Sequence, residues 1–178
     1  MTVRDPLVSV YTALEKAIKN VHGSGFLVTN DTPSPIETKK RSVPAANITY
    51  VSGTSEKALM REHHPHGVLS NGNGTFTVGT EAVRFHYLIQ VSFFAERPSQ
   101  AQRLSTKFLA YIETENEIPI PEDKWGDLVQ IFIASPPLPP RGEPNLYQVD
   151  ATYQCLGQLI VEEQVNAIDV SKFKPKIT

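Results

Sequence analysis

The sequence predicts an α+β fold: a mixed or antiparallel sheet of about four to six strands packed on an N-terminal helix and a central helix, with long loops or arms. Three observations indicate this class. Residues 83–94 alternate between an apolar and a mixed face, which is typical of a half-buried strand. Residues 99–113 then repeat apolar side chains at helical spacing, and residues 147–162 alternate again. With 40% hydrophobic and 20% charged residues among 178, we expect a single domain, residues 1–178, with its own core.

The first expected element is an amphipathic helix that begins at Asp5-Pro6. Aspartate is a favoured N-cap residue, and proline suits the first helical position. Gly23 and Gly25 mark the end of the helix. Its apolar face consists of Leu7, Val10, Tyr11, Leu14, Ile18 and Val21. We expect this face to pack on the sheet rather than to serve a membrane or a partner.

Residues 26–29 and 47–51 are the next strand candidates, and a polar, proline-containing loop joins them. This loop carries three adjacent basic residues, Lys39, Lys40 and Arg41. Such a run can meet an acidic partner. A solvated surface is the more common role of a short charge run, and it is the role we expect here.

Residues 52–82 are the least regular part of the chain and predict an extended hairpin or arm. Residues 55–61 suit a short helix, and the two Asn-Gly pairs of residues 71–74 are strong turn signals. A compact domain rarely carries so long an irregular segment without using it. We therefore expect the arm to reach a neighbouring subunit, with interface residues Arg61, His63, His64, His66, Asn71, Asn73 and Phe76.

The central strand and the central helix meet at a proline. Pro98 cannot donate a hydrogen bond to a ladder, so we expect it to end the strand. Ser99 is then the expected N-cap of the helix, and Gln102 is placed to complete a capping box. The apolar stripe of this helix can cover the apolar face of the strand before it.

Two proline-containing loops flank a short strand beyond the central helix. We expect Trp125 to anchor the first loop, residues 117–122, against the core, and the apolar run 128–134 predicts a buried strand. Prolines crowd residues 135–146 and predict a stiff, extended connector. A docking surface for an aromatic groove is the alternative for this loop, whose candidate interface residues are Pro136 and Pro137.

The second long strand covers residues 147–162. Leu156 and Ile160 interrupt its polar face, which favours contact with another chain or with a loop. Cys155, the only cysteine, lies on the apolar face, and we expect it to act as a small buried hydrophobe. The tail, residues 169–178, is rich in lysine and is expected to be ordered only where something holds it.

The residues predict no catalytic, cofactor or metal site. His63, His64 and His66 are the only clustered metal-type residues, but Pro65 splits them and neighbouring side chains diverge on an extended chain. Cys155 lies in mid-strand without an expected base, and neither a nucleophile elbow nor a phosphate loop is present. A formal net charge of −2 gives no electrostatic reason to expect nucleic acid as the main ligand. No apolar run approaches the roughly 18 residues of a membrane span.

The order of elements resembles the tail-terminator (tail-completion) proteins of tailed bacteriophages. Residues 84–96, 99–113 and 147–163 carry the resemblance, together with the first helix. It implies a structural virion protein that forms a homo-hexameric ring on the head-proximal end of the tail tube. Such a ring would stop tube polymerisation and present a surface to the neck. The implied partners are the tail tube protein, neck or connector proteins and the tail sheath protein, with DNA only passing through the lumen. The implied site is the tail or neck of the virion, after assembly in the host cytoplasm, without turnover, cofactor or membrane.

Three alternatives remain. Another phage neck or head-completion connector protein shares parts of the same pattern. A small metal-dependent enzyme would use the loop of His63, His64 and His66, and a stoichiometric zinc content would support it. A peptide- or ligand-binding module would use the proline-rich loop instead.

Overall fold

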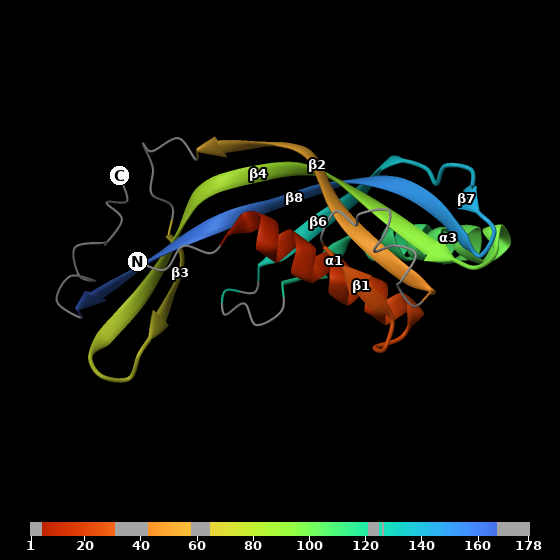
Figure 1. Ribbon diagram of the computed structural model, residues 1–178. Helices are drawn as coiled ribbons and strands as arrows, with labels where there is room; N and C mark the ends of the chain where they lie inside the picture. The colour runs from red at the N-terminus through yellow and green to blue at the C-terminus, as the bar shows by residue number, and fades with distance from the viewer. Residues whose placement is uncertain (1–4, 31–42, 58–64, 121–124, 126, 167–178) are drawn as a thin grey trace.

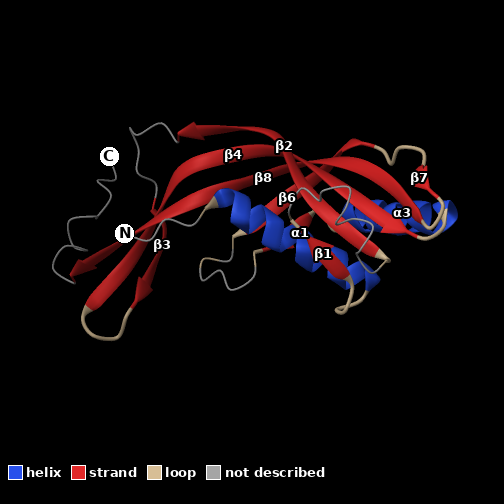
Figure 2. Ribbon diagram, in the orientation of Figure 1, coloured by secondary structure: helices blue, strands red, loops and turns tan. Residues whose placement is uncertain are grey.

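A computed structural model describes residues 5–30, 43–57, 65–120, 125 and 127–166. Within these residues the chain forms two helices and one sheet of eight strands (Figures 1 and 2). The central order of the sheet is β1-β2-β4-β8-β6-β5, while β3 pairs with β4 and β7 pairs with β8. The α+β class is therefore confirmed, although the sheet has more strands than the sequence pattern indicates.

The strands are β1 (Leu27–Thr29), β2 (Ala45–Lys57), β3 (Pro65–Ser70), β4 (Thr75–Ala95), β5 (Glu117–Pro119), β6 (Leu128–Ser135), β7 (Arg141–Glu143) and β8 (Leu146–Asn166). Only β1 and β2 pair in parallel, and the other ladders are antiparallel. The two longest strands, β4 and β8, have 21 residues each and pair with one another from Thr75 and Asn166 to Ala95 and Tyr147. They form the spine of the molecule.

Helix α1 (Pro6–His22) begins and ends where its sequence indicates. Asp5 is the N-cap, and its Oδ1 accepts a hydrogen bond from the backbone N–H of Leu7 at 2.9 Å. Gly23 follows the helix with φ of 106°, a conformation that residues with a Cβ rarely adopt.

The core lies between the two helices and one face of the sheet. The ring of Phe93 in β4 contacts His22 of α1 at a centroid distance of 5.5 Å and Phe108 of helix α3 (Pro98–Thr114) at 5.7 Å. Phe108 also meets Tyr153 of β8 at 5.3 Å. Both helices therefore pack on the same face, which alternates with an outer face along each strand.

The expected start of the central helix is wrong by two residues. Arg97 is the N-cap and makes no side-chain capping bond, Pro98 is the first helical residue, and Ser99 and Gln102 lie inside the helix rather than in a capping box. Proline has no N–H to satisfy and a fixed φ that suits the first turn. The residue expected to end the strand therefore begins the helix.

The short helix expected over 55–61 is also wrong where the structure describes it. Residues 55–57 continue β2, with Ser55 opposite Phe85 and Lys57 opposite Val83 of β4, and residues 58–61 lie outside the described part. Pairing with a long neighbouring strand supplies backbone hydrogen bonds to residues whose local propensity is weak. β4 itself begins at Thr75, eight residues before the expected strand.

β6 is a half-buried strand rather than a fully buried one. Val129 and Ile131 are completely buried, whereas Leu128 is 38% exposed and Phe132 is 39% exposed on the outer face. Neither helix covers that face, so an apolar run does not imply burial on both sides. After β6, the proline-rich residues run beside β8, held by a hydrogen bond of 2.8 Å from the Leu138 N–H to the Asp150 carbonyl.

Candidate interaction surface

A three-stranded ribbon, which we call the arm, extends from the body of the sheet. It consists of β3, residues 75–81 of β4 and residues 160–166 of β8. Figure 1 shows the arm projecting beyond the part of the sheet that the helices cover. A register shift between Glu81 and Val83 marks the point where it leaves the body. Within residues 52–82, where we expect a hairpin or arm, β3 and the start of β4 pair with one another, whereas residues 52–57 belong to β2.

The tip of the arm is a turn built by asparagine and glycine. Gly72 and Gly74 have φ of 76° and 78°, and the Asn71 N–H donates to the Thr75 carbonyl at 3.0 Å. Asn73 Oδ1 accepts from the Thr75 N–H at 3.1 Å, and Asn71 Oδ1 accepts from Thr77 Oγ1 at 3.1 Å. The side chains of Asn71 and Asn73, two of the predicted interface residues, therefore shape the turn.

The pairing register sorts the arm's side chains onto two faces. Phe76 of β4 lies between Ser70 of β3 and Val165 of β8. Two residues further along β4, Val78 lies between Val68 and Glu163. We call these six residues the open face. Val68 is 50% exposed, and Phe76, Val78 and Val165 are only partly buried. An apolar ribbon face with this much exposure is typical of an interaction surface.

The other face of the arm is held by Trp125. Its indole lies over Gly67 of β3 and Gly79 of β4, where a Cβ at Gly79 would lie 2.8 Å from Cζ2 of the ring. The Nε1–H donates to Glu162 Oε1 at 2.9 Å, and Ile160 beside it is only 7% exposed. Trp125 was expected to anchor a loop against the core. Instead it packs across all three strands at the base of the arm.

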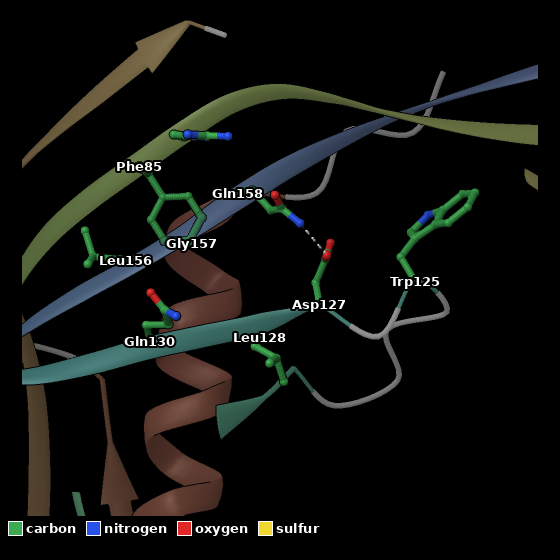
Figure 3. Close-up of a pocket in the computed structure, with 9 residues that line it drawn as sticks. Phe85, Trp125, Asp127, Leu128, Gln130, Leu156, Gly157 and Gln158 are labelled. Atoms are coloured by element: carbon green, nitrogen blue, oxygen red, sulfur yellow. Dashed lines mark hydrogen bonds between the residues drawn. The ribbon is translucent and has the colours of Figure 1, made fainter. Parts of the chain in front are cut away.

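A hollow of about 570 Å³ opens on the sheet beside this base (Figure 3). Pairing between β6 and β8 ends at Gln130 and Leu156, two residues after the start of β6. Gln158 Nε2 donates to Asp127 Oδ1 at 2.8 Å across the gap. The residues that line the hollow are Arg84, Phe85, Trp125, Asp127, Leu128, Gln130, Leu156, Gly157 and Gln158.

The predicted interface residues fall into separate groups. Phe76 lies on the open face, Leu156 lines the hollow, and Ile160 lies under Trp125. Arg61, His63 and His64 lie outside the described residues, and of His66 only the backbone, within β3, is described. Pro136 is exposed and Pro137 half-buried in the segment after β6, at the end of the molecule opposite the arm (Figure 1).

The sequence pattern did not single out Val68, Val78, Val165 or the role of Trp125. A usable signal was present, because Phe76 and Val78 alternate with Thr77 and Gly79 at the two-residue period of a strand. This alternation is out of phase with that of the central strand, and the register shift between Glu81 and Val83 accounts for the change. The partners of that alternation on β3 and β8 become visible only once the register is known.

Two titratable groups, Cys155 and Tyr153, lie in the core. Cys155 is fully buried, as expected, and burial raises the pKa of its thiol to about 12. Burial also raises the pKa of Tyr153, whose hydroxyl has no hydrogen-bond partner among the described residues. In the same residues no three His, Cys, Asp or Glu side chains converge as metal ligands would. Neither described helix has the length and apolar character needed to cross a membrane.

Comparisons with known proteins bear on the fold. No family model matches the sequence, and no curated protein matches it. Among solved structures, the chain is similar to one described as the sheath/tube terminator of an extracellular contractile injection system, PVC, in the extended state. The two are 13% identical, with a TM-score of 0.51 over 92% of this chain. The chain spans 59% of the length of that terminator. At this identity the likeness shows a shared fold.

Proposed function

We propose that this protein is a structural terminator subunit, which caps the tube of a tail-like assembly as a hexameric ring and joins it to the neighbouring component. The observation that carries the proposal is the similarity to a sheath/tube terminator over 92% of the chain. The role is associative, without turnover, cofactor or membrane.

The surfaces of the arm support an associative role. An extended ribbon with an apolar open face and exposed strand edges is a template for pairing with other chains, and monomeric proteins usually cover or shorten such edges. In the proposed assembly the arm contacts a neighbouring copy or the tube. The hollow beside Leu156 and the segment with Pro136 and Pro137 are available for the sheath or the neck. DNA only passes through the lumen, and the protein resides in the tail or neck of the virion.

The test uses tube subunits of the assembly to which the protein belongs. The gold-labelled chain is added to preformed tubes and to polymerising tubes, and both are imaged in negative stain. We expect label at one end of each preformed tube, and shorter tubes when the chain is present during growth. Label along the tube wall, or tubes of unchanged length without end label, would refute the proposal.

A neck or head-completion connector is the alternative function. A connector would bind the portal end of isolated heads rather than the tube end. The same labelled chain added to tail-less heads separates the two roles, because a terminator binds only tubes and a connector binds only heads.

A further inference from the structure

We propose that copies of this protein join through their arms, with the outer edge of β3 from one copy pairing with the tip of β8, residues 163–166, of the next. This inference rests on the proposed ring and names the contact that would close it. β3 pairs with β4 on one side, and residues 163–166 of β8 pair with β4 on one side. No strand among the described residues pairs with the opposite side of either segment.

The two edges are regular and accessible. Residues 67–70 pair with β4 without interruption, after a register shift near Pro65. Val68 and Leu69 are 50% and 36% exposed, and Glu163 and Gln164 are also exposed. Residues 67–70 carry neither the lysines nor the internal bulge that natural proteins use to protect an edge. Both edges are therefore suited to pairing.

Charge decides which edges meet. Two β8 tips brought together would place two copies of Glu163 near one another, and like charges across a strand pair are destabilising. The described side chains of β3, residues 67–70, are uncharged. Pairing β3 with the β8 tip avoids the repulsion and continues the open face, since Val68 of one copy then lies on the same side as Val165 of the next.

Symmetry also favours the unlike pair. A joint between two β3 edges would make a two-fold dimer and leave both β8 tips exposed. A joint between β3 and β8 is heterologous, so each copy offers one edge of each kind and rotation can close a ring. Within one arm β3 and β8 both run antiparallel to β4 and are therefore parallel to each other. In a ring whose axis follows the arms, the new ladder would be parallel.

The experiment is a charge reversal with rescue, read by light scattering after size-exclusion chromatography. The wild-type chain of 19.8 kDa should run as a multiple of that mass. The double variant Val68→Glu/Leu69→Glu places one acid on the face of Glu163 of the next copy and one on the face of Gln164, and it should run as a monomer. Adding Glu163→Lys and Gln164→Lys to that variant should restore the wild-type mass. Val8→Glu, at a residue of α1 that is 54% exposed, is the matched control and should assemble normally.

Circular dichroism melts show whether each variant folds. If the double variant does not fold, Ser70→Glu, at an exposed position of the same edge, replaces it. A wild-type monomer, a double variant that still assembles, or a rescue that stays monomeric would overturn the inference. If the double variant is monomeric and the added lysines do not restore assembly, the contact is a β3–β3 dimer or lies elsewhere. A wild type that caps tubes while the double variant also assembles would leave the terminator role standing. Rings that depend on the arm but bind neither tubes nor heads would support the arm contact and refute the terminator role.

Discussion

Replacing Trp125 with alanine should loosen the arm without unfolding the body. The indole lies across Gly67 and Gly79 and donates to Glu162 Oε1 at 2.9 Å. Because the side chain is half-buried, its apolar surface contributes about 1 to 1.5 kcal/mol, half of the value for a fully buried side chain. A hydrogen bond to a carboxylate adds about 1.5 kcal/mol. The expected loss is about 3 kcal/mol of local stability.

Hydrogen exchange measured by mass spectrometry reads this loss directly. Since about 1.4 kcal/mol corresponds to a tenfold change, amides of residues 75–81 and 160–166 should exchange roughly 100-fold faster in Trp125→Ala. Amides of residues 85–93 should be unchanged, because they belong to the helix-covered core. Trp125→Phe keeps a ring over the glycines and loses only the donor, so its effect should be about half in free energy.

Phe132→Ala is the matched control, because it removes another partly exposed aromatic side chain, from β6, that belongs to the body. It should leave exchange in the arm unchanged. Equal protection of residues 75–81 in the wild type and in Trp125→Ala would refute the reasoning. Faster exchange spread evenly over the arm and the core would refute it as well, since it would show that the arm does not open as a separate unit.

Three further predictions concern the body. Gly157→Val should destabilise the protein by about 1 to 3 kcal/mol in urea unfolding, because a Cβ there overlaps the Phe85 ring. Adding Phe85→Ala to the same chain should recover part of this loss, and additive losses of the two changes would contradict the reasoning. Burial, then the charge of Lys107, lower the pKa of His22 from its ordinary 6.5, against a hydrogen bond from the imidazole to the Leu104 backbone, which raises it. The unfolded chain therefore binds the proton more readily, so stability should fall as the pH drops below 6.5, and His22→Phe should flatten that part of the stability curve. Cys155, with a pKa of about 12 and no exposure, should react with a thiol reagent only on unfolding; a fast reaction of the native protein would contradict its burial.

The elements that could be predicted from the sequence are those whose signal is local. Asp5 followed by proline, with Gly23 at the other end, delimits α1 correctly because capping depends on a few neighbouring residues. The alternation of Phe85, Ile89 and their neighbours identifies the core face of β4 for the same reason. The start of α3 was missed because Pro98 is compatible with both a strand end and a first helical turn.

The arm could be foreseen only as an irregular hairpin. Its strands depend on pairing between distant residues, such as Thr77 with Gln164, and a single sequence does not reveal that register. The role of Trp125 depends on two glycines that come together only when β3 and β4 pair. The sequence therefore singled out the turn residues, Asn71 and Asn73, and only Phe76 of the open face beside them.

The physical character of the arm argues for a partner. An isolated ribbon of few strands without a helix over it is marginally stable, and here Trp125 and the cross-strand contacts hold it to the body. Selection for a stable monomer would shorten such a ribbon or charge its edges. The chain instead extends β4 and β8 to 21 residues each and leaves Val68 half exposed on the ribbon's apolar face. Pairing with another chain would bury the edge and the face together, so the ribbon gains in an assembly the stability that it lacks alone.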